Sequence, residues 1–267
     1  IRLLGDIGSE RGGQHAVNVS IISLLLGRAM GLSAQDLEDL GEAALLHDLG
    51  KAMLPERVRW LSPEFSKAEA RAWRDHVTLG QQLGQRMKLS TSAMQAIAQH
   101  HEHADGSGFP QQLSGERIAV PARIVALVNR YDNLCNPALA AGAKTPHEAL
   151  SLMFAQEKQH FDALILTHFI RLVGVYPPGS LVQLTDDRWA MVVSVNTARP
   201  LKPRVLVMDP GVPSDQALHL DLEQVPDLGI RRSLRSDQLP GRAVDYLAPR
   251  KRVAYFFDVE SPSLEQA

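Results

Sequence analysis

The sequence predicts a mainly α-helical domain followed by a small, mostly β-stranded C-terminal part. Up to residue 174, apolar side chains recur at intervals of three and four residues, which is the period of an amphipathic helix. After residue 174 come short β-branched and aromatic runs separated by Asp, Asn, Pro and Gly, as in strands joined by turns. We therefore expect two domains, a helical one over residues 1–174 and a β-rich one over residues 175–267.

Seven helices are expected in the first domain. They lie near residues 13–30, 34–49, 67–88, 93–103, 120–135, 146–158 and 163–173. Ser66 with Glu69 and Ser92 with Gln95 are capping-box pairs, which mark the first turn of a helix. The Thr-Pro-His-Glu segment at 145–148 adds a proline at the first helical position. These signals place helix starts near residues 67, 93 and 146.

Four strands are expected in the second domain. They lie near residues 181–184, 190–193, 204–207 and 253–257, after a Tyr-Pro-Pro-Gly turn at 176–179. Each run is short and rich in Val, Leu or aromatic residues. The second domain is therefore predicted to be a small sheet.

Composition is that of an ordinary globular protein, with 45% apolar and 22% charged residues in 267. No apolar run reaches the length of a membrane span, and we expect a cytoplasmic protein. A net charge of −2 argues against a protein that binds polymeric nucleic acid. A single cysteine, Cys135, excludes an internal disulfide. Because the chain opens at Ile1, we expect it to be a fragment that lacks an upstream regulatory region.

Histidines are concentrated in the first domain, where six of the ten lie within the first 103 residues. Three apolar stripes with helical spacing each include one: Leu37-Leu40-Ala44-His47, Trp73-His76-Leu79-Leu83 and Met94-Ile97-His101. Three helices that present histidines from their buried faces would bring them to one interior site.

The chemistry of this set favours a polynuclear metal site. Imidazole nitrogens suit late first-row divalent metals, and the two oxygens of Asp48, next to His47, can bridge a pair of ions. Such a pair can clamp a phosphoester and ionise a water at neutral pH, so hydrolysis is the first reaction to consider. A lone histidine is more often structural. The set as a whole argues against a purely structural role, because it contains the adjacent pairs His47-Asp48 and His100-His101 with His76 between them.

In their order along the chain these motifs resemble the HD-GYP family, a branch of the HD-domain metal-dependent phosphohydrolases. The resemblance runs from about His15 to Gly174 and rests on His15, His47-Asp48-x-Gly50-Lys51, His76, His100-His101-Glu102 and Gly108-Phe109-Pro110. It implies an all-α HD-domain bundle with two or three metals, often iron or manganese. It also implies hydrolysis of cyclic di-GMP to linear pGpG or GMP.

The resemblance also implies roles for individual residues. One metal would be held by His15, His47 and Asp48, and the second by His76, His100 and His101 with Asp48 bridging and central to catalysis. Lys51, three residues after Asp48, would contact the scissile phosphate from the same helical face. Further substrate contacts are expected from Gly108, Phe109, Pro110 and Lys144.

Four departures from the family pattern bear on activity. Asn129 stands where the family has an aspartate ligand, and Asp132, on the same helical stripe, is an alternative that acts through a water. Arg11 stands where three-metal members have a glutamate, so two metals are expected. The segment 136–139 lacks the family's phosphate-gripping Arg and Lys and leaves only Lys144 nearby. Phe109 replaces a tyrosine and keeps the ring.

Two other function classes stay open. The first is a catalytically weak sensor or adaptor that binds cyclic di-GMP or a diguanylate cyclase (GGDEF) partner, which Asn129 and the missing cations favour. The second is an oxygenase-like di-iron enzyme on the same scaffold. Lys51 and the Gly-Phe-Pro loop favour phosphate chemistry over the oxygenase.

Overall fold

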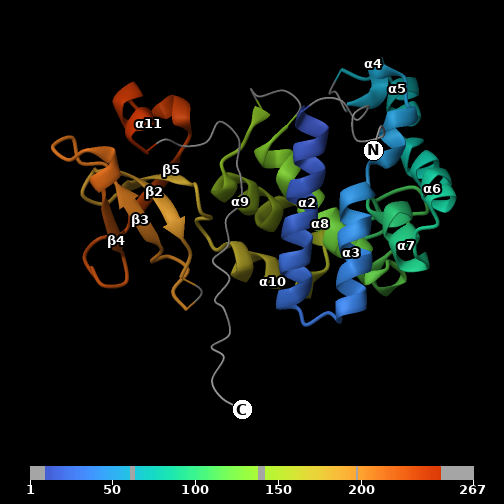
Figure 1. The fold of residues 1–267 in the computed structure, drawn as a ribbon, viewed down its shortest axis with the longest axis horizontal. Coiled ribbons are helices and arrows are strands. Elements are labelled where there is room, and N and C mark those ends of the chain that lie inside the picture. The colour runs from blue at the N-terminus through green and yellow to red at the C-terminus, as the bar shows by residue number, and fades with distance from the viewer. Residues whose placement is uncertain (1–9, 61–63, 138–141, 197, 248–267) are drawn as a thin grey trace, which may run out of the picture. The chain divides into compact units, whose positions relative to one another are not determined.

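The computed structural model describes residues 10–60, 64–137, 142–196 and 198–247 (Figure 1). It divides into two compact units, one made of residues up to 144 with 149–172, the other of residues 145–148 with 173 onward. The first unit is helical and the second contains a small antiparallel sheet, which confirms the predicted fold class. The predicted domain boundary at residue 174 stays a prediction.

The helices have the following bounds. They are α2 (Glu10–Ala29), α3 (Ala34–Leu46), α4 (Glu56–Arg59), α5 (Lys67–Arg74), α6 (His76–Met87), α7 (Thr91–Gln99), α8 (Val120–Cys135), α9 (Pro146–Gln156) and α10 (Ala163–Val173), with the 3₁₀ turns η1 (Leu49–Met53), η2 (Gly115–Arg117) and η4 (Lys158–His160). Within the described residues no helix is both long and apolar enough to cross a membrane.

Two of the three predicted helix starts are confirmed by their caps. Ser66 and Glu69 form a reciprocal capping box at the start of α5. At α9 the Thr145 hydroxyl accepts from the Glu148 amide, and the Glu148 carboxylate accepts from the Thr145 amide.

The start of α7 differs from the prediction, because Ser90 rather than Ser92 caps it and accepts from the Ala93 amide. Lys88 ends α6 in a left-handed conformation with φ of 60°. The Leu89 amide then bonds back to the Gly84 carbonyl, so Ser90 is the first extended residue free to cap. The helix therefore begins two residues earlier than the sequence pattern predicts.

The long helices predicted over 34–49, 67–88 and 93–103 are shorter than expected. The first ends at Leu46 and continues as the 3₁₀ turn η1, the second breaks at Asp75 into α5 and α6, and the third ends at Gln99. The predicted metal-binding histidines 47, 76 and 100 therefore lie at helix ends and not in the middle of helices.

Small side chains allow the helices of the first unit to approach closely. Helix α3 packs against α2, α7 and α8, and Figure 1 shows α2 and α3 side by side. Ala43, Ala93, Ala96 and Ala122 are fully buried in the layer shared by α3, α7 and α8. The helices that end in histidines are thereby fixed relative to one another.

Turn η1 lies directly on the start of α6. A β-carbon at Gly50 would lie 1.9 Å from the His76 carbonyl oxygen and 2.4 Å from the Gly80 amide nitrogen. Both neighbours are backbone atoms, which cannot move aside as a flexible side chain can. Only glycine allows the Asp48 turn to approach His76 this closely.

The second unit is built on a five-stranded antiparallel sheet. Its strands are β1 (Leu181–Leu184), β2 (Trp189–Ser194), β3 (Arg204–Val207), β4 (Leu218–Asp221) and β5 (Ile230–Leu234), in the order β4-β3-β2-β1-β5. The three central strands match predicted runs. Strands β4 and β5 were not predicted because they are edge strands with polar residues such as His219, Arg231 and Arg232. The strand predicted near 253–257 lies outside the described residues.

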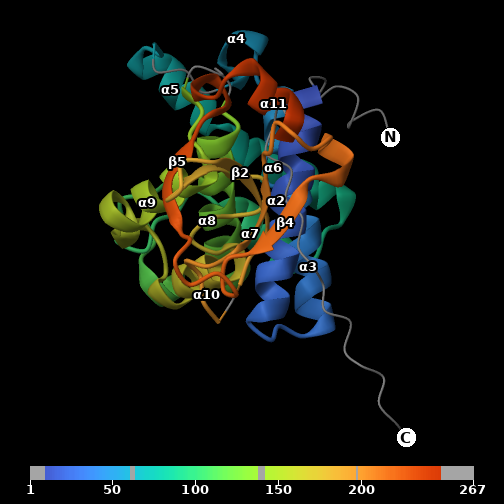
Figure 2. The same cartoon turned by 90° about the vertical axis from the view of Figure 1, so that its left-hand side faces the viewer.

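Both faces of the sheet are covered. One face buries Val182, Leu184, Val192 and Val205, while Leu181 and Leu234 pack with helix α11 (Gly241–Leu247) on the other. In Figure 2 these strands and α11 can be followed in orange and red. The alternation along β1 is that of a strand with two buried faces.

We expect Gly50→Ala to destabilise the protein by about 1–3 kcal/mol, because the added methyl group meets fixed backbone. Urea unfolding followed by circular dichroism measures this. The matched control is Gly13→Ala in α2, where an added β-carbon meets nothing within 4 Å. That change should stabilise the helix by about 0.5–1 kcal/mol. Equal effects of the two substitutions would contradict the proposed packing of η1 on α6.

Candidate metal centre

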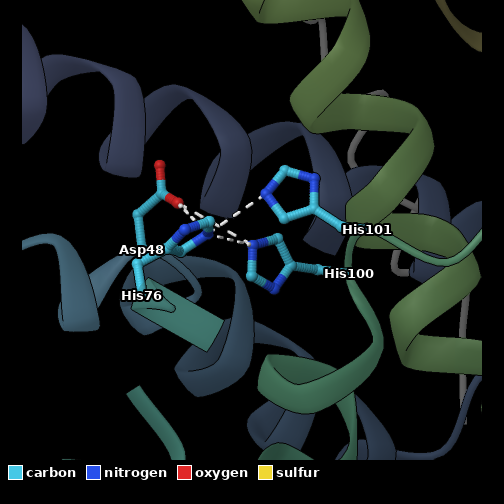
Figure 3. Close-up of side chains that lie close together, drawn as sticks. All are labelled: Asp48, His76, His100 and His101. Carbon is cyan, nitrogen blue, oxygen red and sulfur yellow. Dashed lines mark hydrogen bonds and ion pairs between the residues drawn. The ribbon is translucent and has the colours of Figure 1, made fainter. Parts of the chain in front are cut away.

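The predicted metal ligands lie together in the first unit. His15 comes from α2, His47 and Asp48 join α3 to η1, His76 begins α6, and His100 and His101 follow α7. The ligand atoms form two groups, Asp48 with His76, His100 and His101, and Asp48 with His15 and His47. Within each group the ligand atoms lie within 4.8 Å of one another. Figure 3 shows the side chains of the first group pointing toward one another.

The two oxygens of Asp48 face different histidines. Oδ2 lies 3.8 Å from Nε2 of His15 and 3.3 Å from Nε2 of His47. Oδ1 lies 3.5 Å from Nε2 of His76 and 3.7 Å from Nε2 of His100. The carboxylate therefore stands between two groups of nitrogens, as a bridging ligand would.

Helix ends fix the orientation of three imidazoles. Nδ1 of His47 donates to the Ala44 carbonyl (2.8 Å), Nδ1 of His76 to the Trp73 carbonyl (2.6 Å) and Nδ1 of His100 to a carbonyl three residues earlier (2.7 Å). These carbonyls belong to the last turns of α3, α5 and α7, where no intrahelical partner is available. Because a carbonyl can only accept, Nδ1 carries the proton and the Nε2 lone pair faces the site.

His15 is oriented by a carboxylate instead. Its Nδ1 lies 2.6 Å from Oδ2 of the fully buried Asp132 on α8. Oδ1 of Asp132 accepts from the amide groups of Asn18 and Asn136, each at 2.9 Å. Such a carboxylate fixes the tautomer of a metal-binding histidine and raises its basicity. The helical stripe that Asp132 shares with Asn129 predicts a position near the site, but it does not predict this contact with His15.

The donor set fits metal ions. Nε2 of His15, Nε2 of His47 and Oδ1 of Asp48 are buried and make no hydrogen bond. Nε2 of His76 lies 3.4 Å from Nε2 of His100 and 3.1 Å from Nε2 of His101. Since Nδ1 of His76 and of His100 holds the proton, these two Nε2 lone pairs cannot bond each other. A cation between the converging lone pairs removes the conflict.

Burial favours the neutral form of His47, His76 and His101. It lowers the pKa of His76 to about 3 and also lowers the pKa values of His47 and His101, and nearby histidines add to the effect. For Asp48 burial is not the effect that prevails, because burial alone would raise the pKa of this carboxyl group. The Lys51 ammonium, His47 and hydrogen bonds outweigh burial and hold the pKa of Asp48 well below its usual range. Neutral imidazoles and an ionised carboxylate are the forms that bind metals.

Lys51 lies beside Asp48, with Nζ 2.5 Å from Oδ2. The three-residue spacing brings the two side chains together as expected, although on a 3₁₀ turn and not on an α-helix. The ammonium also lies 5.8 Å from the ring of Trp60 and 5.6 Å from that of Trp73. These aromatic faces stabilise a cation in a partly dehydrated position.

The loop after His101 supports that histidine. The ring of Phe109 stacks on the ring of His101, with centroids 4.6 Å apart and an angle of 16°. A β-carbon at Gly108 would lie 2.4 Å from the His103 amide nitrogen, so glycine is needed for the loop to fold back. The buried Glu102 carboxylate accepts from the amides of Gln111 and Leu113 and holds the far end of the loop.

Two predicted site residues have other contacts. Asn129 is buried on α8, and its Oδ1 accepts from Nδ2 of Asn133 at 2.5 Å. Lys144 is half-buried, and its amide donates to the Leu134 carbonyl. The side chain of Arg11 lies outside the described side chains. The predicted roles of all three stay predictions.

A pocket that is open to solvent lies beside the metal-ligand cluster. Its polar lining includes His15, Asp48, Lys51, Arg59 and Trp60, and the rest is mainly apolar. Neither Lys144 nor the 108–110 loop lines it. The sequence carried no signal for Arg59 or Trp60, because neither belongs to a motif.

His103, Asp105 and His160 form a third group of possible ligands. The two imidazole rings are stacked 4.3 Å apart at an angle of 15°, so their lone pairs run parallel and do not converge. The Asp105 carboxylate accepts from the amide and hydroxyl of Ser107, and that hydroxyl also contacts His103. These contacts explain why the three side chains lie together, because they anchor the loop that contains Ser107.

Comparison with known proteins identifies the family of the chain. The HD domain family model matches residues 6–165. A cyclic di-GMP phosphodiesterase of Pseudomonas aeruginosa is 31% identical over 235 residues, 85% of this chain and 53% of the relative. A 3'3'-cGAMP-specific phosphodiesterase of Vibrio cholerae is 27% identical, over 62% of this chain and 33% of the relative. The chain thus spans about half or less of these relatives' length.

Among solved structures, an HDG"Y"P protein of Bdellovibrio bacteriovorus has a TM-score of 0.51 and 24% identity, over 59% of this chain and 50% of that one. At that identity the likeness shows the fold. The family match covers more than half of the sequence and includes both groups of ligand atoms. The chain therefore belongs to the HD domain family, as its histidine and aspartate motifs predicted.

Proposed function

We propose that this chain is a metal-dependent phosphodiesterase that hydrolyses cyclic di-GMP to pGpG, GMP or both. The observation that carries the proposal is the position of Asp48, whose two oxygens face two separate groups of histidine nitrogens. The activities for which the relatives are named supply the substrate class, a cyclic dinucleotide.

In this proposal His15, His47 and Asp48 hold one ion, and Asp48, His76, His100 and His101 hold the other. Imidazole and carboxylate donors suit iron or manganese. Bound ions would polarise the phosphoryl oxygens and make a water nucleophilic at neutral pH. Asp132 keeps His15 in the tautomer that can bind, and helix-end carbonyls do the same for three other imidazoles.

Lys51 contributes positive charge to the phosphate in this proposal. Its ammonium lines the same pocket as Asp48 and His15. Trp60 and Trp73 exclude water from around the ammonium and so strengthen its hydrogen bonds to phosphoryl oxygens. Phe109 supports catalysis indirectly, because it fixes the ring of His101.

An adaptor that binds cyclic di-GMP without turnover is the second candidate, and the absence of Arg and Lys from segment 136–139 favours it. Reconstitution with manganese, or with iron under anaerobic conditions, followed by chromatography of products separates the two candidates. The 3'3'-cGAMP dinucleotide is assayed in parallel because one relative is specific for it. Binding without product under every metal condition would establish the adaptor. A diguanylate cyclase partner, a cytoplasmic location and an upstream regulatory region stay predictions.

Two metals per chain are expected after reconstitution, and Asp48→Ala should lose both because it removes the shared ligand. Lys51→Ala should keep the metals and lower the turnover number by about 10²–10³-fold, the effect of losing one donor to a developing charge. Elemental analysis and steady-state kinetics measure the two effects. Equal loss of metal in both variants would show that Lys51 supports the centre and not the substrate.

Asp132→Asn should lower the affinity for metal by about 10–100-fold, because an amide orients His15 less well and withdraws the negative charge behind it. The measurement is a metal titration followed by competition with a chelator. Asp245→Asn, an exposed change on α11 with the same loss of charge, is the control. If affinity is unchanged, helix packing alone positions His15.

Asn129→Asp should raise the affinity for metal, most visibly at low metal concentration, because a carboxylate replaces a neutral amide. The Oδ1 atom of Asn129 has two lone pairs, of which the bond from Asn133 uses one. Metal titrations of the variant and the original protein measure the difference. Identical affinities would exclude Asn129 from the ligand set.

A further inference from the structure

Among the residues that the structure describes, Arg59 has no partner that explains its position. Its Nε is buried and makes no hydrogen bond to any residue that the structure describes. With the described part of the chain its side chain makes one hydrogen bond, a long one of 3.4 Å from Nη2 to the Leu54 carbonyl oxygen. A buried guanidinium nitrogen without a partner is costly, so the position calls for a ligand that is not part of the chain.

Its neighbour Arg57 shows what an ordinary surface arginine in the same short helix looks like. The Arg57 side chain is 84% exposed and donates to the Glu69 carboxylate at 2.7 Å. Arg59 instead lines the pocket that Asp48, Lys51 and Trp60 also line. Because the two arginines share a helix and differ in their surroundings, Arg57 is a matched control for Arg59.

A cyclic dinucleotide has two phosphodiesters. In the proposed function one of them lies at the metal-ligand cluster with Lys51, and the other needs a second cation. Segment 136–139 has no Arg or Lys, and Lys144 does not line the pocket. Arg59 is the arginine that does line it.

We propose that Arg59 binds the second phosphate of the cyclic dinucleotide, the one that is not cleaved. A guanidinium offers parallel N–H donors that match two phosphate oxygens, and Nε is one of the donors in such a fork. Trp60 adds an apolar face beside it, suited to a base or to the ribose. Arg59 is thus a substrate-binding residue that selects dinucleotides over simple phosphodiesters. This inference rests on the proposed function.

The test compares Arg59→Gln with Arg57→Gln on two substrates, cyclic di-GMP and bis(4-nitrophenyl) phosphate, which has one phosphodiester. Arg59→Gln should raise KM for cyclic di-GMP by about 10–100-fold, the effect of losing charge-assisted hydrogen bonds. The loss on bis(4-nitrophenyl) phosphate should be at least about tenfold smaller, because no second phosphate is present. Arg57→Gln should change neither KM by more than about twofold.

Metal content and the thermal midpoint are measured for each variant to detect a structural role. Arg59→Lys should restore part of the affinity, because it returns the charge without the fork. Equal losses on the two substrates, an equal effect of Arg57→Gln, or an unchanged KM would each overturn the proposal.

A binding measurement separates this proposal from the proposed function. Quenching of tryptophan fluorescence by cyclic di-GMP gives a Kd whether or not turnover occurs. Binding without hydrolysis would reject the phosphodiesterase and still test Arg59 through the Kd ratio of the two variants. No binding of cyclic di-GMP, together with hydrolysis of bis(4-nitrophenyl) phosphate, would reject both the substrate assignment and the role of Arg59.

Discussion

The centre depends on where the imidazole protons are held. Three histidines donate hydrogen bonds from Nδ1 to carbonyls at helix ends, and His15 donates one from Nδ1 to Asp132. Every one of these Nε2 lone pairs must then face inward, toward Asp48. The breaks in the helices are part of this arrangement. A carbonyl oxygen in the middle of a helix already accepts from a backbone amide, whereas a carbonyl oxygen at a helix end is left to accept from an imidazole.

The sequence was sufficient to predict that the histidines on buried helix faces meet near Asp48, for a physical reason. Apolar periodicity fixes which face of a helix is buried, and a histidine on that face must find a polar partner in the interior. His47, His76 and His101 were found in this way, and the structure brings them to Asp48. The capping box at Ser66 is equally local, because both of its partners lie within one turn.

The rest depends on contacts between residues far apart in sequence. The break at Asp75 lies where η1 approaches α6, a contact between distant parts of the sequence that the apolar spacing within residues 67–88 does not predict. Asp132 contacts His15 across 117 positions, and Arg59 belongs to no motif. Strands β4 and β5 lie at the edges of the sheet. They were not predicted because an edge strand needs fewer apolar residues than a central strand.

The contact of Gly50 with the His76 backbone has a consequence for motion. Asp48 lies two residues before Gly50, and His76 contributes both its ring to the centre and its carbonyl to the contact. Local unfolding at the start of α6 would therefore separate His76 from Asp48, and both belong to the same ligand group. We therefore expect the amides of η1 and of the first turn of α6 to exchange with solvent as one cooperative unit.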